Sequence, residues 1–370
     1  MQERFTVEYH IVGEEGDALE RAKIIRLEQT VEVGEELVPP GLIRDHIIGQ
    51  IENFSALHPQ LFTATISYAV DTTALELTQL LNVIFGNTSI KAGIRVHRID
   101  LSPTLLRNFG GPRFGIAGLR NLLNVQEKPL LCTALKPMGK TPEQIAELAY
   151  SFALGGVDVI KDDHGLTNQP FCQFEQRVTL CVQAVQRAND KTGKNCVYAP
   201  HITAPCTEIM ARATYAKQAG AGALLIAPGL TGFDTLRALA EDERLNLPLI
   251  SHPAWLGSMV TSPDNGLSHR VVFGQLQRVA GADASIYPNY GGRFGFSLAE
   301  CQSIAQGCQE SMGNYPAIFP TPGGGMDLTR IPELLQLYGN DVMFLIGGAL
   351  YSRSPDLVEN AQYFLSLVGR

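Results

Sequence analysis

A regular alternation of apolar runs and helix-like segments constrains this chain more than any other feature. From Pro129 onward, short apolar runs recur, and each is followed by a stretch with amphipathic helical spacing. The runs cover residues 130–136, 157–162, 195–201, 222–227, 247–252, 283–288, 317–321 and 342–347. The helix candidates cover residues 142–154, 174–189, 207–219, 233–243, 269–280, 298–310, 328–337 and 356–367. Eight strand–helix pairs predict a (β/α)8 TIM barrel, and no Gly-x-Gly-x-x-Gly motif supports an open dinucleotide-binding sheet instead.

The first third of the chain lacks this regularity. Short strand signals at residues 5–11 and 62–69 mix with helix-like segments at 18–28 and 74–85. We therefore expect a smaller domain over residues 1–125 and the barrel, with the catalytic site, over residues 126–370.

Composition excludes several classes of protein. The chain has 370 residues, of which 45% are hydrophobic, and a formal net charge of -8, which argues against sequence-independent nucleic-acid binding. It contains neither a run of eighteen apolar residues nor a signal-like N-terminus, so we expect no membrane span and no secretion. The seven scattered cysteines, among them Cys132, Cys196 and Cys206, are typical of reduced core residues in a cytoplasmic protein.

Polar side chains stand at the carboxyl ends of the predicted barrel strands, where barrel enzymes place their active sites. These strand-end residues are Lys136, Lys161, Asp163, His164, His201 and His252. Any one of them is explained well enough as a solvated loop residue. Their coincidence on one rim predicts an active site.

Two glycine clusters follow the last two strands, Gly323, Gly324 and Gly325 after the seventh and Gly347 and Gly348 after the eighth. Barrels commonly bind phosphate at this position, because glycine lets backbone N–H groups approach an anion. The alternative is a tight turn that needs a positive φ.

The segment from Gly155 to His164 ends an apolar run in Lys161, Asp162, Asp163 and His164. Asp163 and His164 offer metal-ligand atoms, whereas a lysine ammonium cannot ligate a metal. Lys161 either neutralises the aspartates or reacts with carbon dioxide to form an anionic carbamate. Burial favours the lowered pKa that the carbamate needs and the aspartates oppose it, so both interpretations stay open.

These motifs, in this order, resemble the large subunit of ribulose-bisphosphate carboxylase (RuBisCO), and more closely the form IV RuBisCO-like proteins. The matching segments are residues 135–137, 155–163, 323–325 and 347–348. The resemblance implies an N-terminal α+β (ferredoxin-like) domain ahead of the barrel, and a homodimer whose active sites lie at the subunit interface. Glu28 and Asn87 match the residues that the partner subunit contributes.

The resemblance also assigns roles to the strand-end residues. It implies a carbon dioxide-derived carbamate on Lys161, and one Mg²⁺ per subunit bound by Lys161, Asp163 and the residue at position 164. Lys136 would be the acid/base for enolisation, and His252 matches the strand-five histidine of the family. His201 and the two glycine clusters would bind the phosphorylated substrate.

Several departures from the carboxylase pattern bear on function. His164 stands in place of a glutamate ligand, so Mn²⁺ is possible beside Mg²⁺. Met138 replaces a lysine, and Arg293 replaces the mobile-loop lysine, which is not a conservative change. Pro253 and Ile286 stand where the carboxylase has two cations for its second phosphate. We therefore expect a monophosphate substrate and no carboxylation of ribulose bisphosphate.

The remaining groups would stabilise an enediolate. We expect a metal-dependent decarboxylase of a 3-oxo sugar-acid phosphate (of the 3-oxo-isoapionate 4-phosphate type), with His201 and Arg293 holding a carboxylate. One alternative is an enolase or isomerase of methylthioadenosine salvage. Another is a non-catalytic phosphometabolite-binding or stress-response protein.

Overall fold

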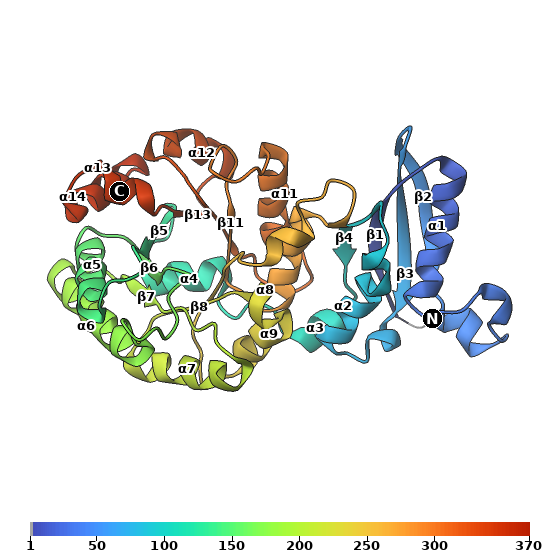
Figure 1. Cartoon of the computed structure of the whole chain (residues 1–370), viewed down its shortest axis with the longest axis horizontal. Helices are drawn as coiled ribbons and strands as arrows, with labels where there is room; N and C mark the ends of the chain where they lie inside the picture. The colour runs from blue at the N-terminus through green and yellow to red at the C-terminus, as the bar shows by residue number, and fades with distance from the viewer. Residues whose placement is uncertain (1–2) are drawn as a thin grey trace.

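The computed structural model describes residues 3–370, which form an N-terminal sheet beside a barrel (Figure 1). The sheet has the strand order β10-β4-β1-β3-β2. Its strands are β1 (Arg4–Val12), β2 (Gln50–His58), β3 (Leu61–Ala69), β4 (Ile94–Asp100) and β10 (Gly266–Leu267). Neighbouring strands are antiparallel except β10, which comes from the barrel half of the chain and runs parallel to β4. The two parts are thus joined through the sheet.

One face of the N-terminal sheet is apolar and covered by helices. Side chains alternate between the two faces of a strand, and along β1 the residues Phe5, Val7 and Tyr9 are fully buried. Tyr9 donates to the backbone oxygen of Ile84 in α2 at 2.6 Å. The helices of this region are α1 (Glu15–Glu28), α2 (Leu77–Phe85) and α3 (Pro103–Phe109), and the next helix along the chain, α4 (Gly115–Leu123), lies with the barrel. The opposite face carries the half-exposed polar residues of β1.

Eight parallel strands form the barrel, as predicted. They are β5 (Leu130–Leu135), β6 (Val159–Asp162), β7 (Val197–Ala199), β8 (Leu224–Ile226), β9 (Leu249–Ser251), β11 (Ala284–Pro288), β12 (Phe319–Gly323) and β13 (Met343–Leu345). Hydrogen bonds link β13-β5-β6-β7 and β8-β9-β11-β12. A parallel bridge between His201 and Leu225 connects β7 to β8, and β12 packs beside β13. The ring is therefore closed.

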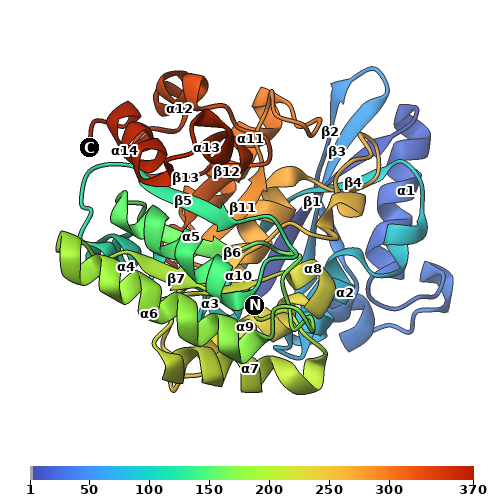
Figure 2. The same cartoon turned by 60° about the vertical axis from the view of Figure 1, so that its left-hand side comes forward.

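Helices surround the strands, with α5, α6 and α7 on the outer side of the barrel (Figure 2). The outer helices are α5 (Pro142–Leu154), α6 (Phe174–Thr192), α7 (Cys206–Ala219), α9 (Phe233–Glu241), α10 (Leu276–Val279), α11 (Leu298–Gln309), α12 (Ile331–Tyr338) and α14 (Leu357–Leu367). Two short helices, α8 (Pro228–Thr231) and α13 (Gly348–Arg353), follow β8 and β13. Capping boxes at Thr141 and Ser297 fix the starts of α5 and α11.

The barrel interior is filled by apolar side chains from the strands. Leu119 and Leu123 of α4 belong to the same buried cluster as Leu130, Val159 and Leu225. Helix α4 therefore packs into the barrel core, and the boundary between residues 125 and 126 stays a prediction. Polar groups lie instead at the carboxyl-terminal rim of the barrel.

Some expectations need correction or addition. Cys206, expected in the core, is exposed at the first turn of α7, whereas Cys132 and Cys196 are buried as expected. The segment expected as one helix over 269–280 is a π-helical turn, Val271–Gln275, followed by the short α10. Strands β2 and β4 have no counterpart among the predicted elements. Over residues 3–370, no helix combines the length and hydropathy needed to cross a membrane.

Candidate active site

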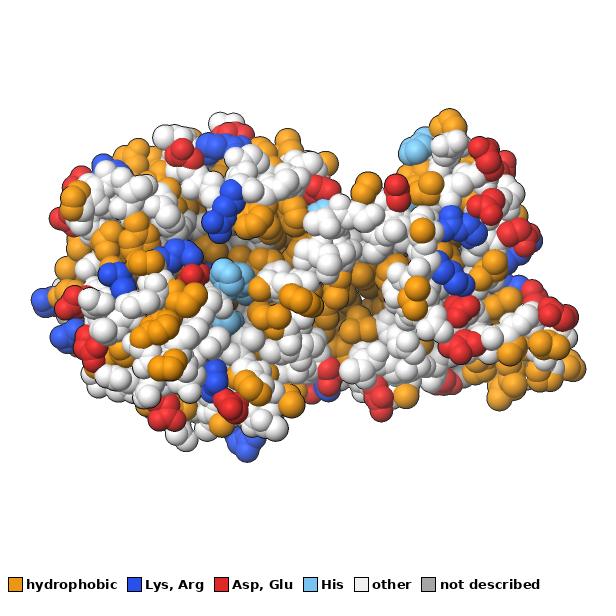
Figure 3. All heavy atoms as spheres, in the orientation of Figure 1, with side chains coloured by type: hydrophobic (Ala, Val, Ile, Leu, Met, Phe, Trp, Pro, Cys, Tyr) orange, Lys and Arg blue, Asp and Glu red, His pale blue; other side chains and the backbone are white. Residues whose placement is uncertain are grey.

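A cavity of about 840 Å³ opens at the carboxyl ends of the barrel strands. On this face the surface is hollowed, and histidine side chains gather there beside basic and acidic ones (Figure 3). The predicted residues that line the cavity are Lys136, Lys161, Asp163, His164, His252, Arg293, Gly324, Gly325, Gly347 and Gly348. The fold therefore brings together residues from six different strand ends, two of which contribute glycines.

The segment at the end of β6 divides its polar side chains between two environments. Lys161 faces the cavity, and Asp162, the next residue on the strand, lies on the other side and is fully buried. The Asp162 carboxylate accepts from Arg177 Nε at 3.1 Å and Tyr198 Oη at 2.6 Å. It also accepts from the backbone N–H of His201 at 3.0 Å. Asp162 is thus a structural ion-pair partner rather than a ligand in the cavity.

Lys161 is the most deeply buried charged group of the site, with only 2% of its surface exposed. Its Nζ donates to the backbone oxygen of Asp162 at 2.9 Å. Burial lowers the pKa of Lys161, although the neighbouring Cys132 thiol and Asp163 carboxylate oppose the shift. A lowered pKa increases the share of neutral amine, which is the form that reacts with carbon dioxide.

Asp163 contacts two neighbouring polar side chains of the cavity. Its Oδ1 lies 2.8 Å from Lys136 Nζ and 3.2 Å from His164 Nδ1. Burial alone would raise the pKa of Asp163, but hydrogen bonds from His164 and Lys136 outweigh burial and hold the pKa below its usual range. Asp163 is therefore ionised and holds Lys136 at the edge of the cavity.

His164 and His252 form a stacked pair, with ring centroids 4.4 Å apart and planes at 14°. Burial lowers the pKa of His252 well below its usual value, and the nearby Lys161 and His164 add to the shift. The backbone N–H of Ala254 donates to His252 Nδ1 at 3.2 Å. His252 is therefore a neutral imidazole whose Nε2 carries the proton and can donate to a substrate oxygen.

The donor set fits a divalent cation once Lys161 is modified. The unmodified Lys161 and Lys136 bring two positive charges against the single carboxylate of Asp163. A carbamate on Lys161 would replace one of those cations by an anion and add oxygen ligands beside Asp163 and His164. Oxygen-rich sets of this kind suit Mg²⁺ or Mn²⁺.

The two glycine turns differ in why they need glycine. Gly324 and Gly325 have φ of 79° and 98°, and a Cβ at either would meet Phe294 or Arg293 at 2.9 Å. Backbone conformation alone therefore explains these two. At Gly348 φ is not positive and a Cβ would meet nothing within 4 Å, and at Gly347 it would approach only the Lys136 side chain, at 3.6 Å. Neither reason applies to Gly347 and Gly348, so close approach of a ligand remains the better explanation there.

Four predicted residues lie outside this cavity. His201 is 1% exposed, with Nδ1 placed 3.0 Å from the Leu166 oxygen and Nε2 without a partner among the described residues. Burial lowers its pKa to about 4. Gly323 is buried at the end of β12. The roles of both in substrate binding stay predictions.

Glu28 and Asn87, the other two, come together at the end of α1. Asn87 Nδ2 donates to Glu28 Oε1 at 3.2 Å, and Lys91 Nζ lies 3.2 Å from Glu28 Oε2. These hydrogen bonds hold the pKa of Glu28 below its usual range, so it is ionised. Helix α1 lies on the side of the sheet away from the barrel (Figure 1), so neither residue reaches the cavity of its own chain.

Sequence reasoning missed part of the cavity wall. His269 lines it, with Nδ1 3.4 Å from Glu300 Oε1 and 3.3 Å from the Arg95 guanidinium of β4. Trp255 stands at the cavity with 73% exposure and the left-handed φ of 72°. Such backbone outliers cluster at functional sites. His269 follows the short β10 rather than a barrel strand, so its position gave no signal.

The sequence of this chain matches a protein-family model and a full-length relative. The model of the ribulose bisphosphate carboxylase large chain, catalytic domain, matches residues 115–291. Ribulose bisphosphate carboxylase-like protein 1 of Rhodopseudomonas palustris is 35% identical over 368 residues, which cover 100% of this chain and 98% of that protein.

A second relative carries the name of an activity. 5-Methylthioribulose-1-phosphate isomerase of Rhodospirillum rubrum is 35% identical over 369 residues, 100% of this chain and 97% of that protein. Among solved structures, a Rubisco-like protein from Rhodopseudomonas palustris superposes with a TM-score of 0.91 at 36% identity, over 100% of this chain and 99% of that one.

Proposed function

Because this chain belongs to the RuBisCO large-chain family, as a form IV RuBisCO-like protein, we propose that it catalyses proton transfer on a phosphorylated carbonyl compound through an enediolate. Isomerisation or enolisation is the reaction that the site supports best. The full-length relative named as a 5-methylthioribulose-1-phosphate isomerase supports this choice over the decarboxylation that the sequence favoured.

The observation that carries the proposal is the pairing of Lys136 with Asp163 at 2.8 Å. The side chain of Lys136 is 34% exposed and lines the cavity, so its amine reaches the space where a substrate would lie. In its neutral form, an amine at this position can take a proton from one carbon of the substrate and return it to another. His252, neutral and with Nε2 carrying a proton, would donate to the developing oxyanion.

Asp163, His164 and a carbamate on Lys161 would hold Mg²⁺ or Mn²⁺ in this site. A divalent cation bound there would polarise the substrate carbonyl and make the adjacent carbon more acidic. The protein's own residues prepare the site in two ways. Hydrogen bonds from Lys136 and His164 keep Asp163 ionised, and burial keeps water away from Lys161.

The substrate would be a monophosphate. Gly347 and Gly348 leave open backbone at one side of the cavity, where a phosphate can approach. Pro253 and Ile286 line another part of the wall, where the resemblance would place cations for a second phosphate. A second phosphate at that apolar wall would be desolvated without a partner, at a cost of roughly several kcal/mol. Carboxylation of ribulose bisphosphate is therefore not expected.

A homodimer would complete the site. Glu28 and Asn87 are preorganised by their mutual hydrogen bond but do not line the cavity of their own chain. We propose that they reach the cavity of a second copy, where the ionised Glu28 would face the cation of Lys136. Mixing Lys136→Met and Glu28→Gln chains tests this arrangement. Activity reappears in the mixture if sites are shared, and stays absent if they are not.

Proton exchange is the test of the proposed reaction. The protein, with Mg²⁺ and bicarbonate, is incubated in D₂O with 5-methylthioribulose 1-phosphate, and deuterium incorporation is followed by NMR. We expect exchange in the wild type and a rate lower by about 10²–10⁴-fold in Lys136→Met. Lack of exchange in the wild type on this and related ketose monophosphates would overturn the proposal. If Lys161→Ala also left metal and phosphate-ester binding unchanged, the non-catalytic interpretation would be preferred.

Arg293 favours decarboxylation as a second candidate. Its guanidinium lines the cavity and stacks on Phe294 at 5.0 Å, and within residues 3–370 no carboxylate pairs with it. A cation in that position can hold the carboxylate of a 3-oxo sugar-acid phosphate. Release of carbon dioxide from 3-oxo-isoapionate 4-phosphate by the wild type, and its loss in Arg293→Met, would establish this reaction. An unchanged Arg293→Met rate would exclude the carboxylate role.

A further inference from the structure

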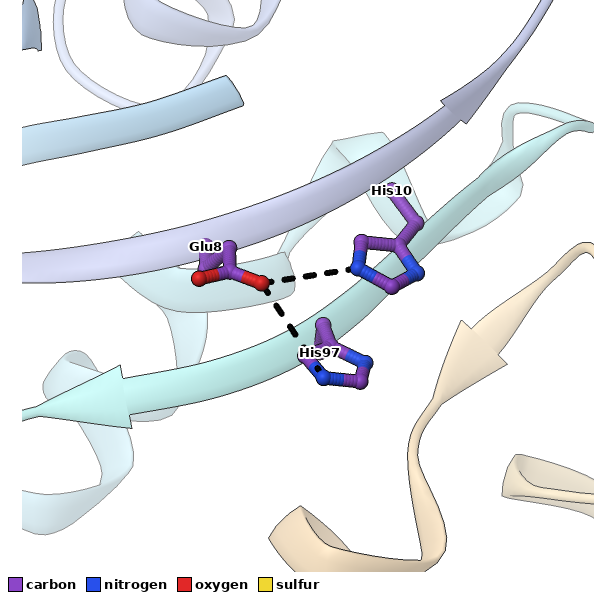
Figure 4. A group of neighbouring side chains, drawn as sticks. All are labelled: Glu8, His10 and His97. Atoms are coloured by element: carbon purple, nitrogen blue, oxygen red, sulfur yellow. Dashed lines mark ion pairs between the residues drawn. The ribbon is translucent and has the colours of Figure 1, made fainter. Parts of the chain in front are cut away.

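A second cluster of potential metal ligands lies on the N-terminal sheet. Glu8 and His10 come from β1 and His97 from β4, and the three side chains converge (Figure 4). One carboxylate oxygen and one nitrogen from each ring all lie within 4.8 Å of one another. None of the three lines the barrel cavity. Their side chains are 32%, 19% and 42% exposed in that order, so an ion can reach them from solvent.

The backbone explains why three ligands meet here. The period of two along β1 puts Glu8 and His10 on the half-exposed face, opposite the buried Val7 and Tyr9. The register between β1 and β4 shifts at this point, so that Arg98 is opposite Glu8 and Val96 is opposite Tyr9. His97 is the extra residue between them. Such a bulge re-aims a side chain, here toward Glu8.

The distances are close to those of a metal site. His10 Nε2 lies 3.4 Å and His97 Nε2 4.0 Å from the same Glu8 oxygen, Oε1. Ligand atoms of a tetrahedral zinc site, bound at about 2.0–2.1 Å, are about 3.3 Å apart. The two rings stack at 3.9 Å with planes at 12°. Binding therefore needs the rings to turn about χ2, a torsion with a broad energy minimum, until both lone pairs meet.

The charge states also suit a metal. Burial lowers the pKa of His97 to about 4, with the neighbouring His10 adding to the shift, so its imidazole is neutral at physiological pH. A hydrogen bond from His10 lowers the pKa of Glu8, which is ionised. The site thus offers the His97 imidazole and the Glu8 carboxylate in the forms that bind metals.

Two of the three nearby arginines are paired with carboxylates. Arg98 pairs with Asp100 at 2.8 Å and lies 3.7 Å from Glu310. Arg270 forms an ion pair with Glu310 as well. Arg95 bonds to backbone oxygens of the 260–267 segment and to His269. These cations weaken, but do not cancel, the attraction of the cluster for a divalent ion.

We propose that Glu8, His10 and His97 bind one divalent transition-metal ion of the Zn²⁺ class, with the remaining coordination position open to water. Two imidazoles and a carboxylate form a donor set that zinc and its neighbours prefer and that Mg²⁺ does not. The bound ion joins β1 to β4 at the bulge, where their hydrogen-bond ladder is interrupted. This site is independent of the proposed barrel chemistry.

Metal titration of the full chain tests the site. The Asp163→Asn protein, stripped by chelator and kept free of bicarbonate, serves as background because it lacks the carboxylate ligand of the barrel. Zn²⁺ binding is measured by calorimetry, and Co²⁺ binding by its visible absorption spectrum. We expect one equivalent of Zn²⁺ per chain, unaffected by millimolar Mg²⁺, and a Co²⁺ spectrum of low coordination number.

Three added substitutions identify the ligands. Glu8→Gln and His97→Gln should each weaken Zn²⁺ binding by about tenfold or more. His58→Gln, at the exposed end of β2 in the same sheet, is the matched control and should bind as the background does. Equal affinity in all four proteins, or no Zn²⁺ binding in the background, would overturn the proposal. If circular dichroism shows that one ligand variant is unfolded, the other decides.

Discussion

The buried ion pair between Arg177 and Asp162 should carry a large part of the barrel's stability. Both side chains have no solvent exposure, and Arg177 Nε lies 3.1 Å from Asp162 Oδ2. The guanidinium also donates to the backbone oxygens of Cys172 at 2.9 Å and Thr167 at 2.8 Å. Replacing Arg177 by Met therefore leaves two carbonyls without their donor and the Asp162 carboxylate without its cation, although Tyr198 and the His201 N–H still donate to that carboxylate.

The size of the effect follows from that loss. Removing one partner of a buried ion pair typically costs about 3–5 kcal/mol. Each orphaned carbonyl would add about 1–3 kcal/mol if the terms were additive, but shared partners make them overlap. We therefore expect Arg177→Met to lower the free energy of unfolding by about 3–5 kcal/mol. Asp162→Asn/Arg177→Met should lose less than Arg177→Met alone, because it leaves no buried charge.

Urea unfolding, followed by circular dichroism, measures the change if the denaturant dependence stays constant. Arg187→Met is the matched control, since Arg187 lies on the same helix, is exposed, and stacks on Tyr150 at 5.4 Å. It should lower stability by no more than about 1 kcal/mol. If Arg177→Met and Arg187→Met unfold at the same urea concentration, the ion pair is not the stabilising element inferred here.

Three further results are expected. Lys136→Met should lower the proton-exchange rate by about 10²–10⁴-fold while phosphate-ester binding persists, as kinetics and calorimetry would show. Gly348→Ala should raise KM for the monophosphate without changing thermal stability, since the added methyl meets no protein atom within 4 Å; an unchanged KM would place the phosphate elsewhere. The pKa of His201 is lowered to about 4, so the unfolded chain binds the extra proton first as pH falls below about 6.5. Stability should therefore decrease by roughly 3 kcal/mol between pH 6.5 and 4, and this slope should be smaller in His201→Asn.

The barrel was predictable because its signal is local and repeated. Each apolar run and each amphipathic helix is readable without its neighbours, and the predicted helix over 142–154 is α5 as observed. Strand β2 gave no such signal because it is an exposed edge strand whose side chains lack apolar alternation. In β4 the alternation Ile94, Val96 is broken by the bulge at His97, so its period cannot be recognised from the sequence.

The candidate site was predictable by position but not by side-chain direction. Strand ends of a barrel converge, which is why Lys136, Lys161 and His252 meet in one cavity. Asp162 and His201 also stand at strand ends in the sequence, yet their side chains are buried outside the cavity. For Asp162 the direction could have been predicted, because side chains alternate between the two faces of a strand. Lys161 and Asp163 face the cavity, so Asp162 between them must face away from it.

The net charge of the buried groups decides whether this cavity can bind a divalent metal. With Lys136 and Lys161 as cations and Asp163 as an anion, the three groups sum to one positive charge, which repels a divalent metal. A carbamate on Lys161 would change that sum to one negative charge. Asp163 would then bind the metal in place of Lys136, and Lys136 would be free to face the substrate. The same buried lysine that is costly to the fold would thus, if carbamylated, set the charge of the site. His164 in place of a carboxylate keeps that sum from becoming more negative, so metal binding here should depend on bicarbonate more steeply than a site with a third fixed carboxylate.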